Sequence, residues 1–375
     1  MVFKKKALII FPDQWLPYSP SILNAARVLT EENYEVHVLT INIGQFGKFE
    51  EFDFQLVSIK IPLYFYKIFR RLHLHNLLRS LVFWRPLKKY QGFDLIIGVD
   101  SLGYLEAKKL VDQPVYLSLE VIKDHLWEKI QKAPPAIVLS QSRERFEYLF
   151  QNISGVHFQW LPNAPIVPQR FQKTVAGIKN QSLKARLIYF GNISAEHGVE
   201  SCIKALINLP EIYQLTLHGP IQAPYRAQLY ARYSRLFETK RIVLSQEYLD
   251  QAQVISYLSE FDIGFCFYDS SLNNDFNYYS CPSGKLFNYL AAGVPIIGGD
   301  ILGLKTVKEH QCGILISTDA QPADIIKAIH SIELQYDFFE ENCYQAAETH
   351  DFRIHFKSFL EKKSNKQGNN LFKNF

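Results

Sequence analysis

The sequence predicts an α/β protein made of two doubly wound domains, each with a parallel sheet covered by helices on both faces. The chain has 375 residues, which is long for one ordinary domain, and 47% of them are hydrophobic, which is enough for two cores. Short apolar runs alternate with helical patterns, as is typical of buried parallel strands. This alternation stops once, near the middle of the chain, and then starts again.

The first domain is predicted to span residues 1–165. A helix follows its first strand, with Ser19 placed as a cap and Pro20 in the first helical turn. The first apolar run is too short for the core of a signal peptide and ends at Pro12, so we interpret it as a buried strand. The expected strands are residues 7–11, 36–40, 95–99, 115–119 and 136–139.

A proline-rich segment separates the two predicted domains. Three prolines lie in residues 161–168 and a polar stretch follows, so we predict a linker at 166–184. The second domain is predicted at 185–349, and a helix at 350–365 is a candidate to pack back on the first domain. The domains are expected to face each other across a cleft at the carboxyl ends of their strands. The expected strands of the second domain are 187–190, 214–217, 242–244, 263–267, 295–297 and 314–316.

Several function classes are excluded by missing motifs. No GxGxxG follows a strand, and neither GxxxxGK[ST] nor HExxH occurs, which argues against dehydrogenases, P-loop kinases and zinc hydrolases. The five cysteines form no CxxC pair, so we expect no metal site and no disulfide framework. No apolar run approaches the roughly 18 residues of a membrane span, and we expect a cytoplasmic protein with reduced thiols.

The segment that starts at Pro282 predicts an anion site. Pro282 fits the first position of a helix, and Gly293 fits the position just past its end. The backbone N–H groups of Ser283 and Gly284 then lie at the helix start, where anions bind, and Lys285 adds a positive charge. A helix terminus contributes only about 0.3–1 kcal/mol, so a second phosphate-binding loop is expected. The candidate is the loop that follows the strand at 187–190.

Here the sequence resembles family-4-like glycosyltransferases of the GT-B type, which have two Rossmann-like domains. The run Pro282-Ser-Gly-Lys-Leu-Phe-Asn-Tyr-Leu-Ala-Ala-Gly-Val-Pro-Ile-Ile297 is similar to their donor-site helix. The run Tyr189-Phe-Gly-Asn-Ile-Ser-Ala-Glu-His-Gly198 resembles their phosphate loop, and Leu161-Pro-Asn-Ala-Pro165 the end of their N-terminal domain. The resemblance implies a retaining transfer from a nucleoside diphosphate sugar, without metal or other cofactor. Positive groups and helix termini would stabilise the departing diphosphate.

The resemblance also implies residue roles, with departures from the family pattern. Asn192 and His197 stand where the family has an Arg and a Lys, and Ser280 and Asn288 stand where it has two glutamates. We expect Asn288 to bind a sugar or ribose hydroxyl and His197 to carry charge when protonated. Because the two glutamates are missing, a catalytically inactive relative of the family is an alternative. The expected donor-binding residues are Gly191, Asn192, His197, Gly219, Glu247, Tyr248, Ser283, Gly284, Lys285 and Asn288.

The first domain offers candidates on the acceptor side. Glu120 ends a predicted strand and His125 follows it, so together with Lys285 they form our candidate catalytic set. The alternative for Glu120 is an acid that stabilises a helix start. Asp13 and Tyr18 follow the first strand, where the family reads its acceptor, although ordinary loop chemistry is an alternative for each.

A basic and aromatic stretch predicts a further partner. No acid occurs from Phe54 to Phe93, whereas eight Lys and Arg residues do, among them Lys67 and Lys89. Residues 67–89 mix these cations with Leu, Phe and Trp, which is typical of a helix on an anionic membrane surface. The alternative is a packed helix with a solvated basic face. No nucleic-acid-binding module accompanies the stretch, so we expect no nucleic acid partner.

The sequence thus predicts a hexosyltransferase-type glycosyltransferase that moves a sugar from a nucleoside diphosphate sugar to a glycan or lipid-linked acceptor. Polysaccharide biosynthesis at the inner face of the membrane is the expected setting. One alternative is a non-catalytic sugar-nucleotide-binding subunit of a membrane glycan assembly. Another is a nucleotide-sugar epimerase on the same double fold.

Overall fold

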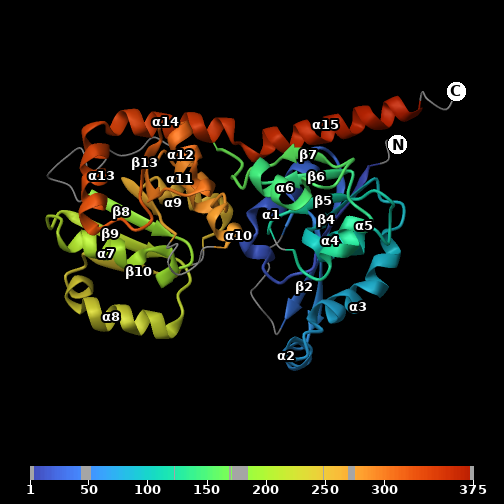
Figure 1. Ribbon diagram of the computed structural model, residues 1–375, viewed down its shortest axis with the longest axis horizontal. Coiled ribbons are helices and arrows are strands. Elements are labelled where there is room, and N and C mark those ends of the chain that lie inside the picture. The colour runs from blue at the N-terminus through green and yellow to red at the C-terminus, as the bar shows by residue number, and fades with distance from the viewer. Residues whose placement is uncertain are drawn as a thin grey trace. The chain divides into compact units, whose positions relative to one another are not determined.

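The computed structural model describes residues 4–43, 52–121, 123–168, 170, 185–247, 249–268 and 275–371 (Figure 1). The chain forms two compact units, the first made of Met1–Pro162 with Phe352–Phe375, and the second of Asn163–Asp351. Each unit contains one sheet, and neighbouring strands pair in parallel in both. This confirms the predicted α/β class with two doubly wound parallel sheets.

The sheet of unit 1 has seven strands in the order β3-β2-β1-β4-β5-β6-β7. Its order reverses between β1 and β4, which pair directly. The strands are β1 (Lys6–Phe11), β2 (Glu35–Ile43), β3 (Gln55–Ile61), β4 (Leu95–Val99), β5 (Val115–Ser118), β6 (Ile137–Ser140) and β7 (His157–Trp160). The helices are α1 (Pro20–Glu31), α2 (Leu63–Arg71), α3 (His75–Leu87), α4 (Asp100–Ala107), α5 (Trp127–Lys132), α6 (Arg143–Phe150) and α15 (Phe352–Leu371).

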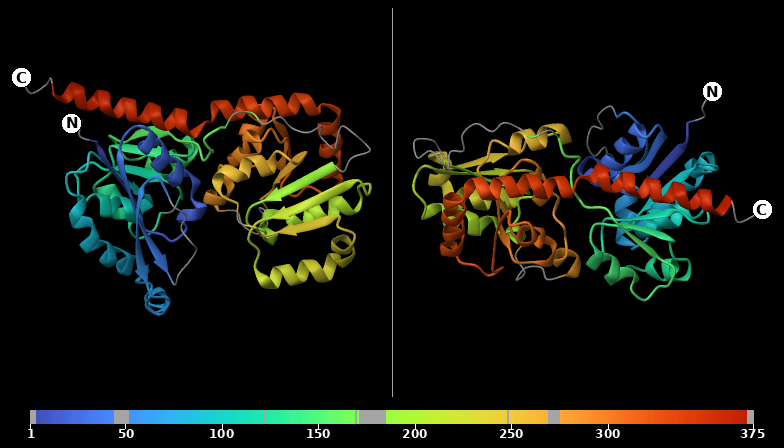
Figure 2. Two further views of the ribbon diagram at one scale, coloured as in Figure 1. Left: turned by 180° about the vertical axis from the view of Figure 1, so that it is seen from behind. Right: turned by 90° about the horizontal axis from the view of Figure 1, so that it is seen from above.

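Helix α15 belongs to unit 1, although it is last in the chain (Figure 2). It packs against α1, and Phe352 and Phe356 are fully buried. The guanidinium of Arg353 makes two hydrogen bonds, of 2.9 and 3.0 Å, to the Glu31 carboxylate of α1. Burial of aromatic rings therefore returns the chain end to the first sheet, with this ion pair at the edge of the contact.

The sheet of unit 2 has six strands in the order β10-β9-β8-β11-β12-β13, with its reversal between β8 and β11. Helices α7 and α13 pack on one hydrophobic cluster, and α9, α11 and α14 on the other. The strands are β8 (Ala185–Phe190), β9 (Tyr213–His218), β10 (Ile242–Ser245), β11 (Ile263–Cys266), β12 (Ile296–Gly299) and β13 (Gly313–Ile316). The helices are α7 (Val199–Ile207), α8 (Ala223–Glu238), α9 (Gln251–Leu258), α10 (Phe276–Tyr279), α11 (Gly284–Ala291), α12 (Thr306–Glu309), α13 (Pro322–Leu334) and α14 (Tyr336–Thr349).

Two strands and one cap differ from the prediction. The edge strands β3 and β7 were not predicted, because β3 is mostly half-exposed and β7 carries polar residues rather than a continuous apolar run. Helix α1 does begin at Pro20, but the side chain of Ser19 does not cap it. The Ser19 hydroxyl donates instead to the carbonyl of Trp15 at 2.9 Å.

All five cysteines carry free thiols. Four of them are buried, and Cys281 is only partly buried. Over the described ranges, no helix combines the length and the hydropathy that crossing a membrane requires.

Candidate functional site

The carboxyl ends of β8 and β9 meet in a tight glycine turn. Gly191 follows β8 with a φ of +122°, and Gly219 follows β9 with a φ of +137°. A Cβ atom at Gly219 would lie 2.1 Å from the carbonyl oxygen of Gly191, so a side chain there has no room. The N–H of Gly191 donates to the carbonyl of His218 at 2.9 Å. The predicted phosphate loop, residues 191–198, is therefore held against the end of β9.

This loop leaves the sheet where the strand order reverses. Strands β8 and β11 are neighbours, and the chain continues from them to opposite sides of the sheet. Open α/β sheets bind ligands outside the carboxyl ends of their strands at such a reversal. The position of the loop alone therefore makes it a candidate binding site.

Helix α11 begins at Gly284, with Ser283 as its N-cap residue. The sequence predicted Pro282 in the first helical position, which is two residues too early. Ser283, with a φ of −57° and a ψ of 126°, has a non-helical backbone, so the helix starts only after it. The N–H groups of Gly284 and Lys285 have no backbone acceptor within the described part of the chain. Groups of this kind give a helix start its affinity for anions.

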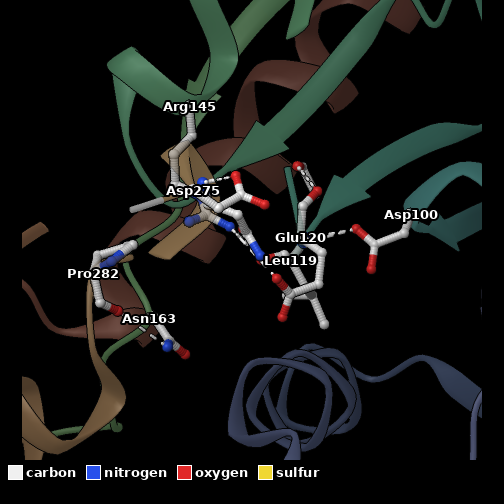
Figure 3. A network of polar contacts seen from close by, with 9 residues as sticks. Asp100, Leu119, Glu120, Arg145, Asn163, Asp275 and Pro282 are labelled. Atoms are coloured by element: carbon white, nitrogen blue, oxygen red, sulfur yellow. Dashed lines mark hydrogen bonds and ion pairs between the residues drawn. The ribbon is translucent and has the colours of Figure 1, made fainter. Parts of the chain in front are cut away.

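The segment before α11 is fixed by an asparagine from the predicted domain boundary. The side-chain amide of Asn163 donates to the carbonyl of Pro282 at 3.2 Å (Figure 3). A Cβ atom added at Gly284 would lie 3.4 Å from this amide nitrogen, which is an ordinary van der Waals contact. The amide of Asn163 therefore lies directly against the first turn of the helix.

Lys285 connects the helix start to the glycine turn. Its Nζ donates to the hydroxyl of Tyr189 at 2.9 Å, and this hydroxyl donates in turn to the carbonyl of Asn192 at 2.9 Å. Its Cε would lie 3.7 Å from a Cβ atom at Gly191. The structure therefore brings the two predicted phosphate-binding elements together around one lysine.

The surroundings of Lys285 are apolar and aromatic. Its ammonium lies 4.5 Å from the ring centre of Tyr189 and 5.0 Å from that of Tyr268. Burial lowers the pKa of Lys285, while the nearby thiols, of which Cys266 has the largest effect, act in the opposite direction. A bound diphosphate would favour the charged ammonium, because an opposite charge in a poorly solvated site stabilises the protonated form.

His197 lies beside Lys285 but does not carry charge at neutral pH. Burial, and secondarily the charge of Lys285, lower the pKa of His197 to about 4. Its Nδ1 lies 2.7 Å from the Ser194 hydroxyl, and its ring packs edge-on against Tyr268 with centres 5.6 Å apart. The low pKa confines the protonated form, which was expected to supply a positive charge, to acidic pH, because the site desolvates the ring and already contains a cation.

The other predicted donor-side residues lie at the edges of this cluster. Asn192 is exposed, Asn288 is half-buried on α11, and Glu247 is exposed after β10. Tyr248 lies outside the described residues. Next to Glu247 the buried ring of His218 stacks on Phe190 with centres 5.2 Å apart.

In unit 1, Glu120 belongs to a cluster of charged residues at the end of β5 (Figure 3). The Asp100 carboxylate accepts hydrogen bonds from the N–H groups of Leu119, at 2.8 Å, and Glu120, at 3.1 Å. The buried guanidinium of Arg145 donates to the Leu119 carbonyl at 2.8 Å and lies 4.0 Å from the Glu120 carboxylate. The backbone at Glu120 is thus held from both sides, while its carboxylate is more than half exposed, with a relative side-chain area of 54%.

The backbone of Asp100 is strained, and the pKa of its carboxyl group is raised. It has a φ of +52°, which is rare for a residue other than glycine, directly after β4. Burial and the nearby Glu120 raise the pKa of Asp100 to about 7, against the two backbone hydrogen bonds and Arg145. Strain and a shifted pKa are frequent at functional sites.

The remaining acceptor-side candidates are more ordinary. Asp13 follows β1, and its carboxylate pairs with Arg79 at 3.3 Å. Tyr18 is 55% exposed, with its ring 6.1 Å from that of Trp15. His125 is exposed, and its charge contributes to the lowered pKa of His75.

Sequence reasoning missed Tyr189, Asp100 and Arg145. Asp100 and Tyr189 carry a signal, since the first directly follows a buried strand and the second lies near the end of one. Arg145 lies in the charged run of α6, where nothing in the sequence distinguishes it from a surface cation. Its burial depends on the contact with the end of β5, which is tertiary.

The structure is similar to solved structures of glycosyltransferases over nearly its whole length. WaaG, a glycosyltransferase involved in lipopolysaccharide biosynthesis, matches with a TM-score of 0.63 and 14% identity, over 94% of this chain and 98% of WaaG. Sucrose-phosphate synthase from Thermosynechococcus elongatus matches with a TM-score of 0.68 and 14% identity, over 97% and 100% of the two chains. HepE from Anabaena, solved with UDP-glucose, matches with a TM-score of 0.64 and 11% identity, over 96% and 99%.

The sequence itself matches no protein-family model and no curated protein. The similarity of structure at these identities shows the fold, which is the GT-B fold of two Rossmann-like domains.

Proposed function

We propose that this chain is a glycosyltransferase that moves a hexose-type sugar from a nucleoside diphosphate sugar to a glycan or lipid-linked acceptor. The observation that carries the proposal is the convergence of the glycine turn at Gly191, the first turn of α11 and the ammonium of Lys285. All three lie where the sheet order reverses, and all three favour a negative group. We further propose that the transfer proceeds with retention and without metal or other cofactor.

The geometry supports a role in departure of the diphosphate. Negative charge on the leaving group grows as the sugar bond breaks, so donors aimed at it lower the barrier as well as bind the ground state. The N–H groups of Gly284 and Lys285 and the Lys285 ammonium are the donors for this charge. Asn288, one turn further along α11, is the proposed partner of a donor hydroxyl.

On the acceptor side we propose Glu120 as the residue that orients the acceptor or assists proton transfer. The support is its exposed carboxylate on a backbone fixed by Asp100 and Arg145. His125, Asp13 and Tyr18 are proposed as further acceptor-side groups. An anionic membrane surface is proposed as the partner that presents a lipid-linked acceptor.

The proteins of similar fold support the substrate class. HepE was solved with UDP and with UDP-glucose. Another structure of similar fold, described as trehalose-6-phosphate from E. coli, was solved with UDP-2-fluoro glucose. These ligands are properties of those proteins. They make a nucleotide sugar the first ligand class to test here.

A second candidate is a non-catalytic sugar-nucleotide-binding subunit. It is favoured by Ser280 and Asn288, which occupy the places of the two family glutamates, and Ser280 is buried. Such a protein would bind the donor without consuming it.

Release of nucleoside diphosphate separates the two candidates. The full chain is incubated with UDP-, GDP-, ADP-, CDP- and dTDP-sugars, with and without membrane lipid extract, and free diphosphate is measured. We expect release from one donor class, and its loss in Lys285→Met. Binding of a donor with no release under any condition would favour the binding subunit.

A further inference from the structure

Helix α2 is exposed along its whole length. None of its residues is buried, and Tyr64 is 72% exposed. Tyr64 and Ile68 are four residues apart, as are Ile68 and Leu72, so these three lie on one side of the helix. The cations Lys67, Arg70 and Arg71, at spacings of three and four, form the adjacent side.

Helix α3 has two apolar faces. Phe83 and Leu87 are buried in the core of unit 1. A second stripe faces solvent at spacings of three, four and three residues, with exposures of 43% to 58%. It consists of Leu74, Leu77, Leu81 and Trp84. Only the first face is explained by packing.

The two helices form one surface. The guanidinium of Arg79, from α3, donates to the Tyr66 hydroxyl of α2 at 3.2 Å. Figure 1 shows α2 beyond the end of β2, with α3 next to it. We call the exposed side chains of residues 63–89 on these helices the α2–α3 surface. Soluble proteins seldom expose so many large apolar side chains in one region without a binding partner.

The charge of the α2–α3 surface is of one sign. No acid occurs between Phe54 and Phe93. Within the described ranges the structure shows no ion pair for Lys67, Arg70 or Arg71, nor for Arg85, Lys88 or Lys89. The Lys88 ammonium lies 4.4 Å from the ring centre of Trp84, which places a cation beside an exposed indole.

We propose that the α2–α3 surface docks on an anionic lipid bilayer, with the apolar side of α2 and the outer stripe of α3 entering the interface. Cations beside large apolar side chains and tryptophan suit the boundary between lipid headgroups and acyl chains. The sequence placed the membrane contact at residues 67–89, and the structure extends it to Leu63, Tyr64 and Phe65, which are all exposed. This inference deepens the proposed function. Only its link to a lipid-linked acceptor rests on that function. Vesicle binding is measured without donor or acceptor, so its failure is distinct from failure of sugar transfer.

Co-sedimentation of the full chain with vesicles tests the charge of the surface. Wild type is expected to sediment with phosphatidylcholine vesicles that contain phosphatidylglycerol, and to remain in solution with phosphatidylcholine alone. The variant Lys67→Gln/Arg70→Gln/Arg71→Gln should bind the anionic vesicles about 100-fold more weakly than wild type, because each lost charge weakens binding about fivefold and the three factors multiply. The matched control, Lys204→Gln/Arg235→Gln/Lys327→Gln, removes three exposed cations from unit 2 and is expected to bind like wild type.

Two outcomes overturn the proposal. One is wild type that stays in solution with anionic vesicles at low salt. The other is equal binding by the α2 variant and its matched control, because net charge alone would then explain the attraction. Circular dichroism of both variants verifies that α2, which has no buried residue, was altered without loss of the fold.

Trp84 reports insertion separately from charge. Its emission is expected to shift to shorter wavelength when anionic vesicles are added, and Trp84→Phe is expected to bind with little of this shift. The variant Ile68→Ser/Leu72→Ser is expected to bind at least tenfold more weakly at high salt, where electrostatic attraction is screened. An unchanged spectrum of wild type with bound vesicles, or unchanged binding by Ile68→Ser/Leu72→Ser, would show that the apolar side chains do not enter the bilayer.

Discussion

The desolvated ring of His197 makes the stability of unit 2 depend on pH in a specific direction. A histidine in the unfolded chain titrates near its ordinary pKa of 6.5, whereas burial and Lys285 lower the pKa of folded His197 to about 4. Between these values the unfolded chain binds a proton that the folded chain does not bind. The free energy of unfolding therefore falls as the pH falls from about 6.5 towards 4.

The magnitude follows from the pKa difference. One pKa unit corresponds to about 1.4 kcal/mol, so the 1.5 units between pH 6.5 and pH 5 correspond to about 2 kcal/mol. His197→Asn removes this titration and retains an oxygen that can accept from Ser194, which now contacts Nδ1 at 2.7 Å. The variant should therefore lose about 2 kcal/mol less stability than wild type between pH 7.5 and pH 5.

Urea denaturation at the two pH values measures this double difference. With an m-value of about 2 kcal/mol per M, the urea midpoint of wild type should fall about 1 M further than that of His197→Asn. His125→Asn is the matched control, because it removes an exposed histidine in unit 1, and it should behave like wild type. Equal midpoint losses for wild type and His197→Asn would refute the account of a desolvated ring beside Lys285.

Two further predictions concern backbone and charge. Gly219→Ala places a Cβ atom 2.1 Å from the Gly191 carbonyl oxygen, whereas Gly92→Ala at a φ of +83° meets no atom within 4 Å. Both positive φ values strain an alanine, by about 1–3 kcal/mol. The clash at Gly219 should cost about 1–3 kcal/mol in addition in thermal unfolding, and equal losses for the two variants would contradict the packing of this turn. Folded Asp100, whose pKa is about 7, keeps a proton that the unfolded chain releases above 3.8, so wild type loses stability as the pH rises towards 7. In urea titrations, the free energy of unfolding of Asp100→Asn should therefore rise by about 3 kcal/mol relative to that of wild type between pH 5 and pH 8. A difference between the two proteins that does not change with pH would show that the carboxyl is not desolvated.

Most of the fold follows from the sequence because parallel strands buried on both faces are continuous apolar runs. Strand β4 begins and ends where the pattern predicts, at Leu95 and Val99. All six strands of unit 2 were predicted to within two residues at their ends. The edge strands β3 and β7 were not predicted, because an edge strand is paired on one side only and tolerates polar residues such as Lys60 and Gln159.

The candidate site was predictable in part, for a related reason. Gly191 directly follows the buried strand β8, and topology brings the carboxyl ends of neighbouring parallel strands such as β8 and β11 together. The segment from Ser283 to Lys285 was found from the pattern of the helix that it starts. The charge states were not predictable, because they depend on burial. His197 is neutral as a result of the rings and the cation around it, and nothing in its local sequence indicates this.

The acceptor side shows the limit of local patterns most clearly. Glu120 was found from its place after a strand, but the groups that fix it, Asp100 and Arg145, come from β4–α4 and α6. Their contribution depends on a left-handed backbone at Asp100 and on full burial of Arg145. Both are tertiary properties.

Calorimetric binding of nucleoside diphosphates and monophosphates tests the central claim most directly. Wild type should bind one nucleoside diphosphate more tightly than its monophosphate, and Lys285→Met should weaken the diphosphate about 10- to 100-fold with little effect on the monophosphate, since a charge-assisted hydrogen bond contributes about 1.5–3 kcal/mol. Lys308→Met, which removes an exposed cation paired with Asp300, is the matched control and should leave both affinities unchanged. Equal diphosphate affinities in wild type and Lys285→Met, or no preference of wild type for any diphosphate over its monophosphate, would contradict the assignment of this helix start as the diphosphate site.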